Sequence, residues 1–220
     1  MKHFFLRLLL TMMGVVFFAF GVVLTIKANI GYAPWDVFHV GLADTIGLSI
    51  GTVSISVGVV LVTIIALLGE RQLGIGTILN MMLIGVFVDA MFPLVPISSN
   101  IITGIIMLLT GIFSLSLGTC FYLKSAFGIG PRDALMVVLA RKTKLPVGIC
   151  RFAVELAATV IGWFFGGMVG VGTVIFVIVI GPCVQIVFKL FKLDVTAVKH
   201  ETLRDTFGRL RGVFRRRVRR

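Results

Sequence analysis

Long apolar runs alternate with short polar segments along the whole chain. Each run has the length of about 20 residues that a helix needs to cross a hydrocarbon core of about 30 Å. The runs lack the alternating polar pattern of barrel strands, so helices that bond their own backbone groups are predicted. We expect an all-α polytopic membrane protein. Its six predicted spans cover residues 4–26, 50–68, 75–95, 101–123, 147–165 and 171–191.

The amino-acid composition also indicates a membrane protein. Of the 220 residues, 58% are hydrophobic and 14% are charged, and the mean hydropathy is +1.11. A soluble domain has about 45–50% apolar and about 25% charged residues. Lys2 and Arg7 precede the first run as in a signal peptide, but no small-residue cleavage site follows. Gly14 and Gly21 of this run also recur in the fourth span, so we expect the first run to be retained.

The chain carries one pattern twice. The stretch "KANIGYAPWDVFHVGLA" from Lys27 returns as "KSAFGIGPRDALMVVLA" from Lys124, at an offset of 97 residues, and the match continues with Gly51 and Gly148. Each copy contains one span, the motif segment and two further spans. Internal repetition of this kind indicates two copies of a single structural unit. The predicted division is a first membrane repeat over residues 1–96, a second over 97–193, and a tail over 194–220.

The second copy is expected to lie inverted in the membrane. The motif segment at 34–45 would form a helix of only about 18 Å, which is too short to cross and suits a broken or re-entrant helix. Three spans per copy is an odd number, so the second copy starts on the other side. Lysines and arginines gather in the segments that this arrangement puts on one side. By the positive-inside rule, both termini are predicted to be cytoplasmic.

The motif contains residues that break one helix and start another. Glycines interrupt the preceding span, and proline suits the first position of a new helix. Asp36 and Asp133 then fall in first turns, where they could simply offset the helix dipole. Alternatively, the broken backbone lines a cavity in which helix N-termini bind a polar or anionic solute. The helix-breaking residues are Gly31, Pro34, Gly128, Gly130 and Pro131.

The two copies differ in the candidate site. Trp35 and His39 in the first copy correspond to Arg132 and Met136 in the second. Trp35 could serve as an interfacial anchor and Arg132 as a positive-inside residue, or both could line a solute site. The candidate solute-binding residues are Tyr32, Trp35, Asp36, His39, Asp89, Arg132, Asp133 and Gln185.

Polar residues within the spans are few. Asp89 corresponds to Gln185 at an offset of 96. A lone acid costs about 2.5–3.5 kcal/mol on insertion and usually faces the bundle interior. Asp89 is therefore expected to border the site or to make a structural hydrogen bond to a neighbouring helix. Arg151 and Glu155 stand one turn apart and are expected to form a structural ion pair.

The sequence contains no nucleophile, metal or nucleotide motif, so neither an enzyme nor a cofactor is expected. Its three cysteines are expected to be buried hydrophobes. The tail from Asp194 carries nine basic residues and three acids, with apolar residues at helical spacing. We expect it to lie on anionic inner-leaflet lipids rather than to bind nucleic acid. The lipid-binding residues proposed there are Arg215, Arg216, Arg217, Arg219 and Arg220.

The first copy resembles a known group. The stretch "GYAPWDVFHVGLADTIGLSIGTVSISVGVVLV" is similar to the YczE/YyaS/YitT-type bacterial integral membrane proteins, most closely the YczE-like branch. The resemblance implies a multi-pass protein of the bacterial cytoplasmic membrane. The inverted repeat itself favours a small secondary transporter or channel-like permease for a polar or anionic small solute. The alternative is a non-transporting scaffold or accessory subunit of a membrane complex.

Overall fold

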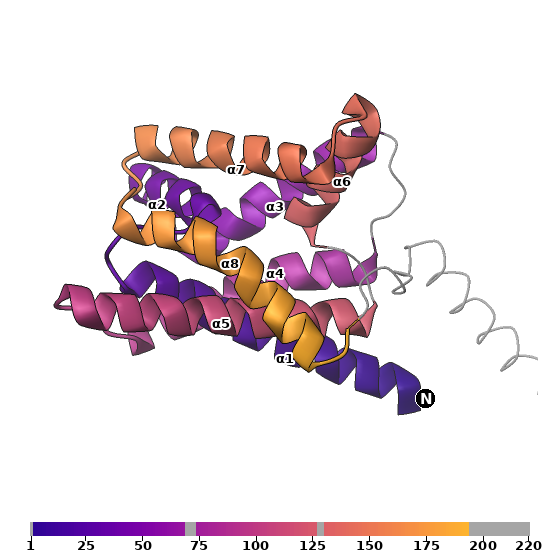
Figure 1. Cartoon of the computed structure of the whole chain (residues 1–220). Coiled ribbons are helices and arrows are strands. Elements are labelled where there is room, and N and C mark those ends of the chain that lie inside the picture. The colour runs from indigo at the N-terminus through magenta and orange to yellow at the C-terminus, as the bar shows by residue number, and fades with distance from the viewer. Residues whose placement is uncertain (1, 69–73, 127–129, 194–220) are drawn as a thin grey trace, which may run out of the picture.

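The computed structural model describes residues 2–68, 74–126 and 130–193. Helices form all of the regular structure in these segments, and six of them are long and apolar enough to span a membrane. The chain is therefore an integral multi-pass membrane protein, and the six predicted spans are confirmed (Figure 1). The helices are α1 (Lys2–Lys27), α2 (Pro34–Ile46), α3 (Ile50–Leu67), α4 (Ile75–Met91), the 3₁₀ turn η1 (Phe92–Leu94), α5 (Ile101–Ser125), α6 (Pro131–Thr143), α7 (Val147–Phe164) and α8 (Val171–Leu190).

The predicted span ends differ from these bounds by a few residues. The third span was expected to continue to residue 95, but its α-helix ends at Met91 and a 3₁₀ turn follows. Pro93 lies in this turn and has no N–H to donate, so it cannot continue an α-helical ladder. The two motif helices, α2 and α6, have 13 residues each and are too short to cross.

Helices α1 and α5 form the antiparallel centre of the bundle. Gly14 contacts Gly118, and Gly21 contacts Gly111, so closely that a Cβ on any of these glycines would lie 2.7–3.0 Å from the carbonyl oxygen of its partner. Between these contacts, Ser114 Oγ donates a hydrogen bond of 2.7 Å to the carbonyl of Phe17. Small residues at such a crossing let two backbones approach where lipid supplies no hydrophobic drive.

The remaining helices lie on one side of this pair, above it in the view of Figure 1. Helix α4 packs on α1, and α8 packs on α5. Each short helix packs on a long helix from the other half of the chain, α2 on α7 and α6 on α3. Helix α3 also packs along α4, whereas α7 makes no comparable contact with α8. The two halves therefore interlock, but one pair of long helices remains apart.

The starts of α1 and the ends of α5 and α8 lie together, which defines the amino-terminal end of the bundle. Arg7 donates hydrogen bonds of 2.6 and 2.9 Å to the carbonyls of Ser125 and Ala126. Lys124 donates one of 3.3 Å to the carbonyl of Phe191. The opposite end holds the junctions from α1 to α2 and from α7 to α8. The positive-inside pattern predicts that the amino-terminal end faces the cytoplasm.

Candidate functional site

The two motif prolines begin their helices. Pro34 and Pro131 occupy the first turns of α2 and α6, where a missing N–H costs no hydrogen bond. Before α2, Gly31 has a φ of 117°, and a Cβ there would lie 2.7 Å from the amide nitrogen of Gly170. Only glycine fits this backbone conformation and approach. It holds the start of α2 against the loop between α7 and α8.

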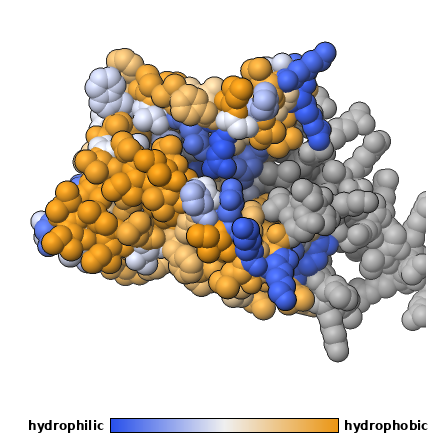
Figure 2. Space-filling model, in the orientation of Figure 1, coloured by the Kyte–Doolittle hydropathy of each residue, from blue (hydrophilic) through white to orange (hydrophobic). Residues whose placement is uncertain are grey.

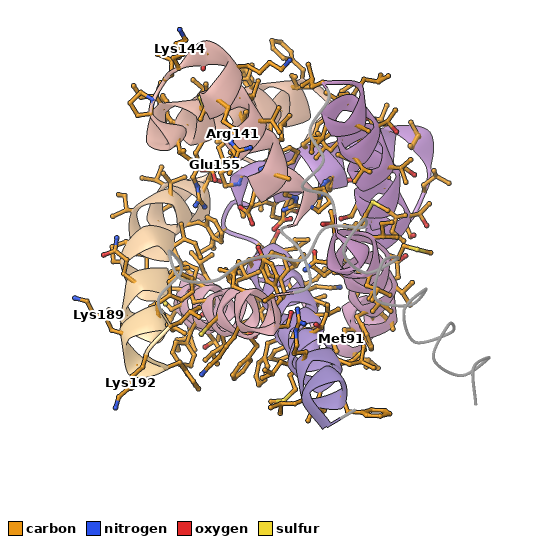
Figure 3. The ribbon with its side chains drawn as sticks, turned by 90° about the vertical axis from the view of Figure 1, so that its right-hand side faces the viewer. Met91, Arg141, Lys144, Glu155, Lys189 and Lys192 are labelled. Atoms are coloured by element: carbon orange, nitrogen blue, oxygen red, sulfur yellow. The ribbon has the colours of Figure 1, made fainter. Side chains whose placement is uncertain are left out.

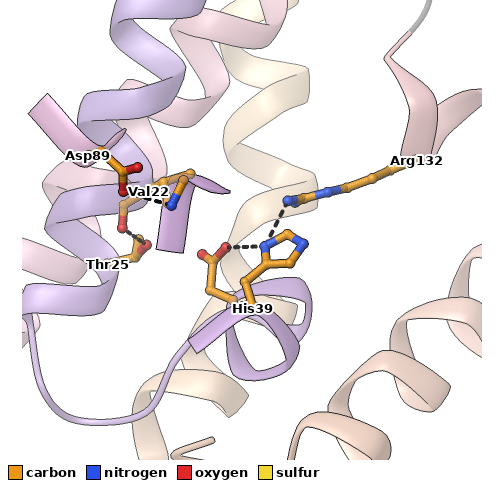
Figure 4. A network of polar contacts seen from close by, with 7 residues as sticks. Val22, Thr25, His39, Asp89 and Arg132 are labelled. Atoms are coloured by element: carbon orange, nitrogen blue, oxygen red, sulfur yellow. Dashed lines mark hydrogen bonds and ion pairs between the residues drawn. The ribbon is translucent and has the colours of Figure 1, made fainter. Parts of the chain in front are cut away.

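The first turns of α2 and α6 face each other through Arg132 (Figure 4). A terminal nitrogen of its guanidinium lies 3.2 Å from Nδ1 of His39, and its centre lies 5.0 Å from the centroid of the Trp35 ring. Arginine only donates, so His39 accepts through Nδ1 and a neutral ring carries its proton on Nε2. Asp36 Oδ1 lies 3.9 Å from the same Nδ1. The structure thus brings four predicted site residues together.

These groups are buried. Asp36 and His39 are 3% and 2% exposed. Nε2 of His39 and Nε1 of Trp35 are buried and have no hydrogen-bond partner within the described part of the chain. A buried donor without an acceptor destabilises the fold by about 1–3 kcal/mol. An acceptor that bonded to either N–H group would remove this cost. Two unbonded buried donors therefore belong to residues that contact the Arg132 guanidinium.

Asp133 is held by a second helix. Its Oδ2 accepts a hydrogen bond of 2.7 Å from the hydroxyl of Tyr122 on α5. Asn80 on α4 is also buried, and its Oδ1 lies with these two oxygens around Gly130, each 3.7–3.8 Å from where a Cβ would stand. Tyr122 and Asn80 were not among the site residues predicted from the sequence. An interior position could have been predicted for Asn80, because a lone amide inside an apolar span usually faces the interior of the bundle.

Two cavities meet at Arg132 and Asp133. The large cavity, about 130 Å³, lies among α2, α7 and α8, with α1, α5 and α6 completing its wall, and is lined by Trp35, Asp36 and Glu155 among others. The small cavity, about 60 Å³, is enclosed by α3, α4 and α6. Its polar lining residues are His39, Ser54, Asn80, Tyr122, Arg132 and Asp133. Charged and neutral polar groups thus line two adjoining cavities between the two halves of the chain.

The large cavity borders the gap between α7 and α8. Arg151 and Glu155 form the predicted ion pair, with 2.9 Å between Nε and Oε1, and both line this cavity. Their side chains are 53% and 22% exposed. Figure 2 shows hydrophilic side chains gathered between the apolar surfaces of α7 and α8. Seen from the amino-terminal end, Glu155 lies at the space above α8, while Lys189 points away from the bundle (Figure 3).

Asp89 and Gln185 lie elsewhere. Asp89 accepts hydrogen bonds of 2.6 Å from Ser49 Oγ and 2.8 Å from the amide of Gly51, which is the structural alternative considered above. Asp89 and Tyr32 line a third cavity at the opposite end of the bundle. At about 490 Å³ it is larger than the two cavities that meet at Arg132. Gln185 is exposed on α8. Gly128 and the five tail arginines lie outside the described residues.

The side chains at the site are suited to binding a small polar solute. Among the described residues, no group of three His, Cys, Asp or Glu side chains could hold a metal ion. Cys120 and Cys150 are buried free thiols, and Cys183 is half-buried. The side chains at the site are hydrogen-bond donors, carboxylates and aromatic rings, which can hold a small polar solute and orient it.

Comparison with known proteins identifies the family. The profile described as "Family of unknown function (DUF6198)" matches residues 5–189. The chain belongs to this family. The match covers all six spanning helices and both motif helices, and it leaves the tail outside. No solved structure matches the chain.

Three relatives match the chain over most of its length. One is named as a membrane protein, and the names of the other two give no description. The chain is 37% identical over 169 residues to "Uncharacterized membrane protein YczE" of Bacillus subtilis, covering 76% of this chain and 79% of that one. It is 32% identical to an "Uncharacterized protein" of Haemophilus influenzae, over 74% of each chain. It is 26% identical to "Uncharacterized protein YyaS" of Bacillus subtilis, over 74% of this chain and 82% of that one. The resemblance to the YczE and YyaS proteins is confirmed.

Proposed function

We propose that this protein is a small secondary transporter or channel-like permease of the bacterial cytoplasmic membrane, with both termini in the cytoplasm. Its solute is polar or anionic and small, and it binds between the first turns of α2 and α6. The observation that carries the proposal is the contact between Arg132 and His39, which joins two broken helices of the two halves at a buried polar cavity. Transporters built from inverted repeats bind their substrates at such discontinuous helices.

The energetics of the buried groups support a solute rather than a purely structural role. Arg132, Asp36 and Asp133 line the large cavity, and charged groups at membrane depth are costly unless they pair or act on a solute. Trp35 lines the large cavity and His39 lines the small one, and their unbonded N–H groups favour a ligand with acceptor oxygens, such as a carboxylate or a phosphate. The large cavity, about 130 Å³, suits a small solute.

A non-transporting scaffold would need none of these features. A bundle that only supports a partner could fill its interior with apolar side chains, which avoids the cost of burying Arg132. The scaffold alternative is favoured only if the purified protein moves no solute and a partner protein co-purifies with it in a fixed ratio.

Uptake into proteoliposomes tests the proposal. The purified chain is reconstituted and offered a panel of small carboxylates, phosphates, zwitterions and neutral polar solutes. Arg132→Gln should abolish uptake of whichever solute is transported. Arg141→Gln is the matched control, because Arg141 is exposed near the far end of the same helix. Equal uptake by wild-type and empty vesicles across the panel would refute the proposal.

A further inference from the structure

One close contact between helices has a sequence counterpart that is not in contact. Gly51 on α3 packs against Gly85 on α4, where a Cβ on Gly51 would overlap the carbonyl oxygen of Gly85. The internal repeat pairs these glycines with Gly148 on α7 and Gly181 on α8. Nothing lies within 4 Å of a Cβ built on either of those two. The α3–α4 side is therefore closed, and the corresponding α7–α8 side is open (Figure 1).

On the closed side, hydrogen bonds join Asp89 on α4 to the start of α3. The corresponding residues on the open side could form only a weaker connection. Asp89 accepts hydrogen bonds from the Gly51 amide and the Ser49 hydroxyl. In the repeat, Gln185 takes the place of Asp89 and Pro146 that of Ser49. The Gln185 amide oxygen is able to accept from Gly148 N–H as Asp89 does from Gly51. A neutral acceptor forms a weaker bond than a carboxylate, and Pro146 has no hydroxyl for a second bond.

The two cavities are also counterparts. Both are built around a motif proline, Pro131 for the small cavity and Pro34 for the large one. Asn80 in the small cavity corresponds to Phe176 in the large one, and Ser54 corresponds to Arg151. The small cavity, about 60 Å³, lies on the closed side and the large cavity, about 130 Å³, on the open side. Equivalent positions of the two copies thus enclose the same kind of pocket at two degrees of closure.

We propose that the small cavity is the second half of the solute site, and that it opens toward the opposite end when α3 leaves α4 and α7 closes on α8. This inference rests on the proposed transport function and supplies its access route. In this second state, with α3 apart from α4, the contact between Gly51 and Gly85 is broken. A contact between Gly148 and Gly181 forms in its place. Ser54, Asn80 and Tyr122 then receive the solute that Arg151 and Glu155 face in the observed state.

The fold has the parts that this exchange needs. The glycine crossing of α1 and α5 is common to both sides and stays fixed, so the flanking helices can move against it. Helix α8 contains Pro182 directly after Gly181, which removes one backbone hydrogen bond and lets the helix bend there. Arg132 and Asp133 line both cavities and remain beside the solute throughout. Rocking of one group of helices against another is the usual form of alternating access.

Paired cysteines test whether the open side closes. In the full chain, with Cys120, Cys150 and Cys183 replaced by alanine, Pro146→Cys is combined with Gln185→Cys. The matched pair on the closed side is Ser49→Cys with Asp89→Cys. Oxidation in native membranes should link the closed-side pair and also the Pro146–Gln185 pair. If the closed-side pair links fully and the other pair never does, the inference is overturned.

Single alanines provide a second test that does not depend on disulfides. A reporter, Ser54→Cys, is labelled with a membrane-impermeant thiol reagent from the side of the opposite end. Gly51→Ala pushes α3 from α4 and should raise labelling severalfold. Gly148→Ala obstructs closure of α7 on α8 and should lower it severalfold, although it touches nothing in the observed state. Unchanged labelling in both variants would overturn the inference.

The two proposals fail separately. Cross-linking of Pro146→Cys with Gln185→Cys in a protein that moves no solute would retain the exchange of states and remove the transport function. Uptake by a protein whose α7–α8 pair never cross-links, and whose labelling is unaffected by Gly148→Ala, would retain transport and remove the proposed access route.

Discussion

The guanidinium of Arg132 lies 3.2 Å from Nδ1 of His39, although the two residues belong to different halves of the chain. Neither half contains the site alone, because α6 supplies the cation and α2 supplies the imidazole, the indole and a carboxylate. The half-helices must therefore be positioned by their contacts with the other half, α2 on α7 and α6 on α3.

Arg132→Lys should weaken solute binding even though it keeps the charge. Lysine lacks the planar group that stacks on Trp35 and donates to His39 at the same time. Trp163→Phe leaves Trp35 as the single tryptophan, since the chain has two. Its fluorescence should change on solute addition and report about a tenfold weaker affinity in Arg132→Lys, corresponding to about 1.4 kcal/mol. Identical titrations would show that the stacking has no role.

Tyr122→Phe should destabilise the protein by about 1.5–3 kcal/mol, the range for a hydrogen bond to a charged group. The substitution removes only the hydroxyl that donates to Asp133. Thermal unfolding in detergent measures the effect. Tyr32→Phe is the control, since Tyr32 is half-buried at the separate cavity of the opposite end. Equal unfolding temperatures for both variants would contradict the structural importance of the Tyr122–Asp133 bond.

Asp89→Ala should cost about 1.5–3 kcal/mol, because it leaves the Gly51 amide without its charged acceptor. Gln185→Ala, at the corresponding position, should change the free energy of unfolding by less than about 0.5 kcal/mol because Gln185 is exposed. Chemical denaturation of both variants gives the comparison. A larger loss in Gln185→Ala than in Asp89→Ala would reverse the assigned roles of the two residues.

Gly21→Val should disrupt the centre of the bundle. A Cβ at Gly21 would lie 2.7 Å from the carbonyl oxygen of Gly111, and such overpacking costs about 1–3 kcal/mol or more. Gly148→Ala should leave the unfolding temperature unchanged or slightly raised, because its Cβ meets open space and alanine favours helix over glycine. Retained yield and unfolding temperature in Gly21→Val would argue against close packing of α1 on α5.

Cysteine labelling should place the two ends of the bundle on opposite sides of the membrane. Single cysteines at Ser98 and at Val169, which is exposed in the α7–α8 junction, should react from outside the cell, and one at Lys142 should react only after permeabilisation. The reason is the concentration of basic residues at the amino-terminal end. Labelling of Lys142→Cys from outside intact cells would reverse the predicted orientation.

The lengths of the apolar runs were sufficient to predict the spans, because the thickness of the membrane sets the length that a spanning helix needs. The internal repeat predicted that α2 and α6 would be short helices starting at prolines, and they start at Pro34 and Pro131. The sequence could not show that Arg132 reaches His39, since no local pattern links residues on two separate helices. It also did not separate Asp89 from the site, because a lone acid in a span predicts an interior position but not its partner.

The hydrogen bond from Ser114 to Phe17 bears on the evolutionary origin of the repeat. The two residues are 97 residues apart, which is the offset of the sequence repeat, so the bond joins corresponding positions of the two copies. A chain of half this length could make the same contact with a second molecule of itself inserted in the reverse sense. The first copy ends on the face where the second begins, so the short segment between Leu94 and Ile101 is enough to join them. Duplication and fusion of one gene would then have replaced a chance pairing of oppositely oriented molecules with a covalent one.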